Sequence, residues 1–523
     1  MQGIVVLLAM AGCTTVGPDF VPPASPAPEQ WRQTDRTVHA PTSAVQGRWW
    51  EAFGDPVLGT LIDIALRNNN SLKVAGLRVL EARAQLGIAA GTPYPQVQQA
   101  VGGATYTQAS ENAANTAGGA DLRFWEYSVG ASVAWELDFW GKFRRGIESA
   151  DANFLGSIAA YDNALVLLVA QVADTYVAIR SAEEQLRVAQ ENVALQQRSL
   201  QITEARFRGG DVDELDVLQA RTQLLSTQAT IPQVDLGLQQ ARHAMSTLLG
   251  RPPGGLAEMA SSPPGVIPAP PQALATGVPA DLLRRRPDVR QAELAAATQS
   301  AAVGVAEADL YPSFGLTGFL GLVAADGTNT TRTGNSGFGQ LFNASSLSFV
   351  GGPYFSWNIL NYGRIRNNVR LQDARLQQLL VNYQDAVLNA VKEVEDGMVA
   401  FLRNRQQAQI LALTDVSAQR SLRLATIQYR EGMADFQRVL DAQASLLKAQ
   451  QQLVAARGAT ASSAIGIYRA LGGGWEVRSG FDFVDAASKE AMQQRVNWGE
   501  LLNPAATQPP DRAAGGGYPS PDW

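Results

Sequence analysis

Residues 207–228 read FRGGDVDELDVLQARTQLLSTQ, and residues 429–450 read YREGMADFQRVLDAQASLLKAQ. The two stretches align without a gap at an offset of 222 residues (429 − 207), which brings Gly210 onto Gly432. In each stretch a glycine interrupts residues that favour helix, a pattern typical of a helix that ends, turns and starts again. The gap-free match indicates that the chain is an internal duplication.

The duplication extends towards the N-terminus of both copies. Tyr94 falls on Tyr311 at an offset of 217 residues, and Trp135 falls on Trp357 at 222. The difference of five residues (222 − 217) places a longer insertion in the second copy, between these landmarks. Each copy is therefore expected to have the order helix, strand, strand, very long helix and helix.

Apolar residues spaced by seven predict the very long helices. The first copy keeps this spacing at eight positions: Ile158, Leu165, Val172, Ile179, Leu186, Val193, Leu200 and Phe207. The second copy repeats it from Leu380 to Tyr429, with Asp415 as the one exception. Such a spacing keeps one helix face against a neighbour and imposes a left-handed supercoil. Pro232 is expected to kink or interrupt the helix that returns from the first turn.

Two strands are expected in each copy, at about 96–107 and 125–138 and at about 313–322 and 346–359. The clearest alternation puts apolar side chains on one face: Tyr127, Val129, Ala131, Val133, Trp135 and Leu137. Aromatic residues near the strand ends fit the interfacial girdle of a membrane barrel: Trp125, Tyr127, Trp135, Trp140, Tyr354 and Trp357. The strand pattern alone leaves open a soluble sheet with one wet face.

The composition excludes several classes of protein. The 42 Lys and Arg against 48 Asp and Glu give a net charge of −6, with no basic surplus for nucleic acid. Two histidines and one cysteine exclude most His/Cys metal sites and any internal disulfide. The chain lacks the GxSxG, HExxH, Walker and CxxC patterns, so we expect no catalytic residues and no metal site.

The N-terminus predicts a lipid anchor. Residues 1–12 include the short apolar run GIVVLLAMAG and are interpreted as a lipoprotein signal peptide. The run ends directly before Cys13 and is similar to a bacterial lipobox, which implies N-acyl and S-diacylglycerol lipid on Cys13 and no other cofactor. Thr14 is not the aspartate that retains lipoproteins at the inner membrane, so the outer membrane is expected. Residues 13–60 are interpreted as a lipid-anchored, extended N-terminal arm.

The duplication sets the other domain boundaries. The first repeat covers 61–250 and contains a helical hairpin at 141–249 with its tip near 209. A Pro-rich linker at 251–277 leads to the second repeat at 278–472, which contains a hairpin at 363–471 with its tip near 432. A C-terminal equatorial segment with a flexible tail follows at 473–523. The tail is expected to pack loosely outside the helices or to stay disordered.

Four strands cannot close a barrel. In lipid an open sheet edge leaves unpaired backbone groups, each costing several kcal/mol. Strands that span a membrane would therefore need several chains in one barrel. Two chains would give eight strands and an interior filled by side chains, so three chains are the smallest closure with a useful lumen.

Together with the segment LLRRRPDVRQAE (282–293), these features resemble the outer-membrane efflux protein (TolC-like) family, in its NodT-type lipoprotein branch that serves resistance–nodulation–division (RND) pumps. The resemblance implies an α+β membrane protein: a trimeric tunnel with a 12-stranded outer-membrane β-barrel, four strands per chain, and a long periplasmic α-helical coiled-coil barrel. It implies the exit duct of a tripartite efflux pump that passively conducts drugs or toxic compounds. The implied partners are two further copies in a homotrimer, a periplasmic adaptor, an inner-membrane RND pump and outer-membrane lipid of a Gram-negative bacterium.

The resemblance also implies a periplasmic gate at the hairpin tips. Asp441 falls on a family lumen acid, and Arg438 replaces a second acid, so that the two could pair in a constriction. Tyr429 and Asp216 fall on a pair that ties neighbouring hairpins shut. Tip residues implied in adaptor docking are Arg208, Gly210, Asp213, Arg430, Gly432 and Asp435. For Asp213 and Asp435 the sequence itself favours solvated positions at helix N-termini.

Two alternatives remain at this point. One is the outer-membrane duct of a type I protein secretion system. The other is a lipid-anchored coiled-coil scaffold of the envelope, which explains the heptads but not two strand pairs at matching positions of the repeats.

Overall fold

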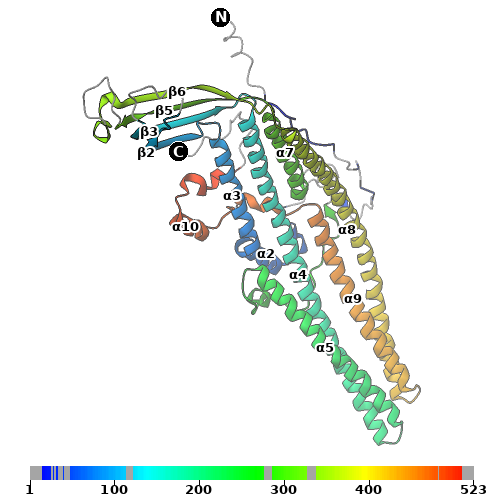
Figure 1. Ribbon diagram of the computed structural model, residues 1–523. Coiled ribbons are helices and arrows are strands. Elements are labelled where there is room, and N and C mark those ends of the chain that lie inside the picture. Colours follow the sequence, from blue (N-terminus) through cyan, green and yellow to red (C-terminus); the bar gives the residue numbers. More distant parts are fainter. Residues whose placement is uncertain are drawn as a thin grey trace.

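The computed structural model describes residues 15–24, 28, 31–32, 39–40, 47–112, 122–275, 285–326, 337–480 and 482–508. The predictions for the signal peptide, Cys13 and residues 509–523 fall outside these residues. The molecule is elongated, with a sheet at one end and two long helical hairpins that reach the other end (Figure 1).

The helices repeat in length as well as in order. They are α2 (Pro56–Asn68), α3 (Asn70–Gly91), α4 (Lys142–Arg208), α5 (Glu214–Leu248), α7 (Pro287–Ala308), α8 (Arg364–Arg430), α9 (Phe436–Ala470) and α10 (Ala486–Arg495). Both α4 and α8 have 67 residues, and both α5 and α9 have 35. The two copies therefore build hairpins of equal length.

The buried face of α4 changes along the helix. Ile158 and Ile179 are buried as the spacing of seven predicts, whereas Phe207 is 43% exposed within the single chain, so the seam that one chain buries does not extend to it. Below Leu186 the buried positions move to Gln196 and Thr203. The upper part of α4 packs on α3 and α7, whereas its lower part meets α5 and α9, so different neighbours select different faces.

Pro232 lies inside α5, which continues through it, so the expected interruption does not occur. A proline removes one backbone hydrogen bond of a helix, and packing of α5 along α4 holds the helix on both sides of that site. Among the described residues, α4 is also the one helix apolar enough to cross a membrane, but 56% of that apolar stretch is buried in the protein, as in a core helix.

The strands form one antiparallel sheet in the order β2-β3-β5-β6. Their bounds are β2 (Val97–Gln108), β3 (Arg123–Leu137), β5 (Ser313–Ala325) and β6 (Leu347–Ser356). The two copies meet at β3 and β5, where Gly130 pairs with Gly321. A Cβ on Gly130 would lie 2.6 Å from the Cα of Gly321, so glycine permits the close approach. The outer edges of β2 and β6 pair with no other strand of the described chain.

Tryptophans tie the sheet to the helices in a repeated way. The indole of Trp135 donates to the carbonyl of Pro93 (2.8 Å), and that of Trp357 donates to the carbonyl of Leu310 (3.0 Å). These pairs are repeat-related, because Pro93 and Leu310 differ by 217 positions (310 − 93). At the other end of the sheet Trp125 packs on Tyr106, so aromatic side chains lie at both ends.

The main core lies at the middle of the helical body. Trp49 and Trp50 in the short helix η1 (Trp49–Phe53) are buried, and Trp49 stacks on Tyr468 of α9 at 4.9 Å. Residues of the arm also pair in parallel with the linker, as β1 (His39–Ala40) lies against β4 (Leu274–Ala275). The arm and the linker are thus joined to the helical body.

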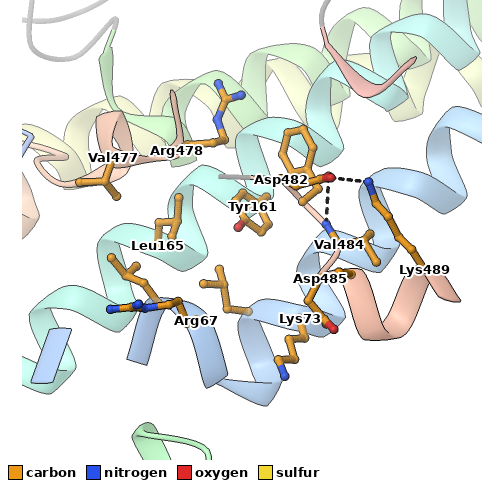
Figure 2. Close-up of a pocket in the computed structure, with 14 residues that line it drawn as sticks. Arg67, Lys73, Tyr161, Leu165, Val477, Arg478, Asp482, Val484, Asp485 and Lys489 are labelled. Atoms are coloured by element: carbon orange, nitrogen blue, oxygen red, sulfur yellow. Dashed lines mark hydrogen bonds and ion pairs between the residues drawn. The ribbon is translucent and has the colours of Figure 1, made fainter. Parts of the chain in front are cut away.

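The C-terminal segment packs closely against α3 and α4 (Figure 2). Phe483 is buried, and its ring meets that of Tyr161 at 4.9 Å. Farther on, Arg83 of α3 donates to the carbonyl of Ala506 at 2.8 Å. The expected loose packing is therefore wrong for residues 482–508, because apolar residues within this polar segment reach the core.

A pocket of about 450 Å³ lies between the C-terminal segment and the helices (Figure 2). Leu165 and Tyr161 of α4 line it, and Arg67, Lys73 and Lys489 add cationic groups to the lining. Lys489 is paired with Asp482, which also lines the pocket. The pocket shows how the segment covers this part of the helical body.

Gly76→Ala is expected to loosen the C-terminal segment. A Cβ on Gly76 would lie 1.8 Å from the carbonyl oxygen of Phe483, so the two backbones must separate, at a cost of about 1–3 kcal/mol. Limited proteolysis within residues 482–508 should be faster in this variant. Gly87→Ala on the same helix is the control, since its Cβ would meet nothing within 4 Å. Equal cleavage rates in both variants would contradict the packing described.

Candidate functional site

The tips of the two hairpins are built by the same backbone motif. Gly210 (φ +81°) and Gly432 (φ +72°) adopt the left-handed conformation that glycine tolerates best. Next to them, the N–H of Asp211 donates to Arg206 and the N–H of Met433 donates to Gln428, each to a carbonyl five residues earlier. These are Schellman caps, which end α4 and α8 and turn the chain sharply.

Aspartates begin the return helices. Asp435 holds the N-cap position of α9 and accepts the backbone N–H of Arg438 (3.3 Å). Asp213 holds the equivalent N-cap position of α5. Both are exposed, as are the other residues predicted to dock a partner: Arg208, Gly210, Arg430 and Gly432. All six lie at the same end of the molecule, at the turns of the two hairpins.

Tyr429 and Arg206 join the two hairpins. Tyr429, in the last turn of α8, is 3% exposed and packs against Phe436 at 5.2 Å. The guanidinium of Arg206, from the last turn of α4, lies 4.7 Å from the centre of the Tyr429 ring and donates to its backbone carbonyl at 2.5 Å. Cation–π contact and a charge-assisted hydrogen bond therefore act between α4 and α8.

Asp216 lies in the first turn of α5, close to this contact. Partial burial raises the pKa of Asp216, and repulsion from Asp213 and Asp435 raises it further, whereas Arg206 lowers it. Asp216 also contributes to the raised pKa of Tyr429, whose main cause is burial. The predicted pair of Tyr429 and Asp216 thus lies in one electrostatic neighbourhood, with Arg206 as a third member.

Asp441 and Arg438 lie on the exposed side of α9. Asp441 accepts a hydrogen bond from Gln437 at 2.9 Å, and Arg438 donates to Gln428 of α8 at 3.5 Å. Within the described residues no ion pair joins Arg438 to Asp441. Asp441 therefore lies on the exposed side of α9, six residues after the N-cap Asp435 (441 − 435).

The sequence patterns did not predict a role for Arg206 at the tip, although a comparison of the two repeats points to it. Its repeat counterpart is Gln428 (206 + 222), and the counterpart of Asp216 is Arg438 (216 + 222). In the structure Arg206 is electrostatically coupled to Asp216, and Gln428 contacts Arg438. The two repeat-related positions therefore face one another in each hairpin. In the first hairpin they hold the charged pair of Arg206 and Asp216, and in the second they hold Gln428 and Arg438.

Two polar layers hold the hairpins together above the tip. Asn192 of α4 donates to Gln450 of α9 at 2.7 Å, and Gln443 donates to Ser199 at 2.6 Å. The layers are seven residues apart on both helices (199 − 192 and 450 − 443), as expected for an antiparallel coiled coil. Gln196, between the layers, is 2% exposed. Polar seams specify register at some cost in stability.

Among the described residues, no group of three or more His, Cys, Asp or Glu side chains is arranged to hold a metal ion. The chemistry of the tip is therefore that of carboxylates, guanidinium groups and helix ends.

Comparison with known proteins gives consistent matches over most of the chain. The family model described as outer membrane efflux protein matches residues 61–251 and 278–473. The chain is 32% identical over 478 residues to the cation efflux system protein CusC of Escherichia coli O6:H1 (strain CFT073), covering 90% of this chain and 98% of the relative. It is 30% identical to the pyoverdine export outer membrane protein OpmQ of Pseudomonas putida KT2440, covering 90% of this chain and 97% of that protein. The solved outer-membrane channel OprN matches with a TM-score of 0.81 at 32% identity, over 88% of this chain and 99% of that one.

Asp216→Asn is expected to tighten the tip at neutral pH. An acid whose pKa is raised by folding contributes most stability below its ordinary pKa of 3.8, and loses that contribution as the pH rises through the raised value. Asparagine does not ionise, so the variant does not lose stability in this way as the pH rises. Hydrogen exchange of residues 206–216, corrected for intrinsic rates, should be slower than in the parent at pH 7 and equal to it at pH 3, below the ordinary pKa. A pH-independent difference would contradict the assignment.

Proposed function

The chain belongs to the outer membrane efflux protein family, and on this premise we propose that three copies join their sheets in one barrel and their helices in one tunnel, closed at the hairpin tips. The protein is the outer membrane channel of a tripartite efflux pump. This channel lies in the outer membrane and extends into the periplasm. An adaptor and an inner-membrane pump are the partners that such a system implies. The family is one of channels and not of enzymes.

The observation that carries the trimer is the open sheet. Four strands leave the outer edges of β2 and β6 available, and β6 carries exposed apolar side chains such as Phe349 (73% exposed) and Phe355 (70%). If β6 of one copy pairs with β2 of the next, the backbone N–H and C=O groups of both edges are hydrogen-bonded, and lipid covers the apolar face. Three copies then contribute twelve strands (3 × 4) to one barrel.

The gate we propose is the contact of the two hairpins at Tyr429. Arg206 and Tyr429 hold α4 and α8 together, and Asp216 lies close enough to influence both. The seam above contains hydrogen-bonded layers that water can replace when the hairpins separate. Around Tyr429, however, an apolar cluster that includes Ala220 and Phe436 spans both hairpins, so opening at the tip also exposes apolar surface.

Asp441 is proposed to face the lumen. Three copies around one axis bring three such carboxylates together, and a ring of like charges attracts cations to the constriction. Arg438 lies three residues away on the same helix, where it is held by Gln428. Its pairing with Asp441 across neighbouring copies would moderate the ring.

The exposed turns of the hairpins are proposed to receive the adaptor. Arg208 and Arg430 end the long helices, and Asp213 and Asp435 begin the return helices, so each turn offers both signs of charge. Charge complementarity of this kind favours register and encounter rate more than affinity.

Cys13 is proposed to carry the lipid anchor, with acyl chains in the outer membrane. The support is its place directly after an apolar run that ends in small residues. The cargo is proposed to be small molecules selected by the pump. The relatives compared here are named for cations and for pyoverdine, so no one cargo follows from relationship.

Native mass spectrometry of protein extracted from outer membranes tests the assembly and the lipid together. We expect a trimer with acyl mass on every chain. The Cys13→Ser variant is the matched control, and it should lack the acyl mass. A stable monomer would overturn the shared barrel, because four strands would then have to close in another way.

Asp441→Ala is expected to weaken block of the channel by multivalent cations about tenfold and to raise leak, since the variant removes the carboxylates that concentrate cations. Single-channel recording in planar bilayers measures both quantities. Gln437→Ala is the control, because it removes the hydrogen-bond partner of Asp441 and keeps the charge. Unchanged block in Asp441→Ala would contradict the lumen position.

A further inference from the structure

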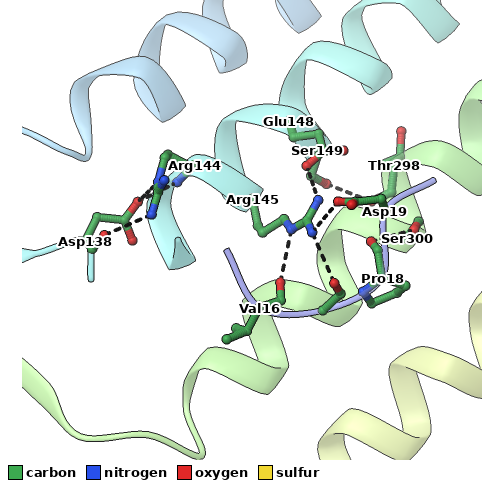
Figure 3. Close-up of polar contacts among 11 residues, drawn as sticks. Val16, Pro18, Asp19, Asp138, Arg144, Arg145, Glu148, Ser149, Thr298 and Ser300 are labelled. Carbon is green, nitrogen blue, oxygen red and sulfur yellow. Dashed lines mark hydrogen bonds and ion pairs between the residues drawn. The ribbon is translucent and has the colours of Figure 1, made fainter. Parts of the chain in front are cut away.

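Arg145 is a buried cation at the start of α4, where the helical body meets the sheet (Figure 3). Its side chain is 5% exposed. The guanidinium donates to the carbonyls of Val16 and Gly17, both at 3.1 Å, and to the carboxylate of Asp19 at 2.7 Å. A fourth bond, to Glu148 at 2.7 Å, balances the charge from its own helix. Three of the four bonds therefore hold one short segment of the N-terminal arm.

The backbone of the arm passes very close to that of α7. Gly17 has φ +88°, and a Cβ there would lie 2.3 Å from the Cα of Gly304 in α7. A Cβ on Gly304 would in turn lie 2.8 Å from the carbonyl oxygen of Val16. Two glycines on different elements thus permit one backbone crossing. Side chains other than hydrogen would push the arm out of reach of Arg145.

Further bonds complete the clamp, which we define as Arg145, Gly304 and the residues 15–19 that they contact. The N–H of Val16 donates to the carbonyl of Trp140 (3.0 Å), and the hydroxyl of Ser300 in α7 donates to the carbonyl of Pro18 (3.3 Å). The arm is therefore fixed to both α4 and α7, which belong to different copies of the duplication.

We propose that Arg145 is a positioning residue for the lipid anchor. It holds residues 16–19 of the arm at a fixed place on α4 and so limits how far the anchor can lie from that place. This inference rests on the proposed acylation of Cys13. Only Thr14 separates Cys13 from the clamped residues. Two residues of extended chain span at most about 7 Å, so the clamp keeps the acylated cysteine within that distance of Thr15. The lipid is thereby held beside the base of the sheet.

Loss of the clamp would lengthen the tether, which is the stretch of chain between Cys13 and the first residue of the arm that is fixed to the body. The next described residue of the arm that is buried is Trp31 (6% exposed), where Arg32 also donates its N–H to Glu395. A tether from residue 13 to residue 31 has 18 residues (31 − 13) instead of two. Effective concentration falls roughly as the −3/2 power of tether length, so the anchor would be about 30-fold more dilute at the base of the sheet.

A purely structural role for Arg145 predicts something different. The clamp also joins α4 to α7, so its loss could weaken the fold whether or not a lipid is attached. A structural role depends on the presence of the bonds and not on how many residues separate them from Cys13. The position of an insertion relative to the clamp therefore separates the two roles.

The first measurement is hydrogen exchange of residues 15–20 in the full-length, lipidated protein. Arg145→Met should accelerate exchange of the Val16 amide at least tenfold, since an arm released by Arg145 also loses the bond from the Val16 N–H to the carbonyl of Trp140. Arg144→Met is the matched control, because Arg144 is the next arginine on α4 and holds the Asp138 carboxylate at 3.2 Å. Equal exchange in both variants would overturn the clamp.

The second measurement compares two insertions of six Gly and Ser residues, one between Thr14 and Thr15 and one between Phe20 and Val21. The rate of appearance of membrane-inserted trimers is followed by pulse-chase labelling. With Arg145 present, we expect the first insertion to slow assembly several-fold and the second to leave it unchanged. In the Arg145→Met background the two insertions should act alike.

Equal effects of the two insertions in the presence of Arg145 would overturn the positioning role. A parent protein that forms no trimer at all would instead overturn the proposed channel, and this outcome is visible in the same experiment before any variant is compared. The two failures are therefore distinguishable.

Discussion

Backbone hydrogen bonding at the sheet edges is the constraint on which the rest of this structure depends. The chain makes a four-stranded sheet and leaves β2 and β6 as edges. Water can satisfy such edges, but lipid cannot. In the trimer that we propose, the missing partners are the sheet edges of other copies of the chain. The long helices of that assembly follow the same symmetry, and each side chain at the tips meets its counterparts around the axis.

Duplication explains the geometry of the helices, and divergence explains their charges. The two hairpins have the same helix lengths and the same glycine caps. At the tips, however, Arg206 corresponds to Gln428, and Asp216 corresponds to Arg438. The backbone motif places both pairs in matching positions, whereas the side chains give one hairpin a cation that reaches Tyr429. The contact between Arg206 and Tyr429 is therefore a product of divergence between the two hairpins.

Both ends of the chain reinforce the body that lies between the sheet and the tips. The arm is fixed near the sheet by Arg145 and reaches the core through Trp49 and Trp50. The C-terminal segment crosses α3 at Gly76, where the two backbones come into contact. The tips are thus separated from a middle region in which several segments, distant in sequence, are packed together.

The sequence by itself determined the duplication, the order of elements, the turns at Gly210 and Gly432, and the positions of Asp435 and Asp441 on the return helix. These features follow from local spacing, because helix periodicity, strand alternation and glycine caps depend on neighbouring residues. Other features emerged from the fold alone: the exposure of Phe207 within the chain, the continuation of α5 through Pro232 and the packing of residues 482–508 on the body. The same holds for the contacts that Arg206 and Arg145 make with other segments. The physical reason is that these outcomes depend on which surfaces lie opposite one another in space. A periodic pattern states which face of a helix is apolar, but it does not state which neighbour covers that face at each level.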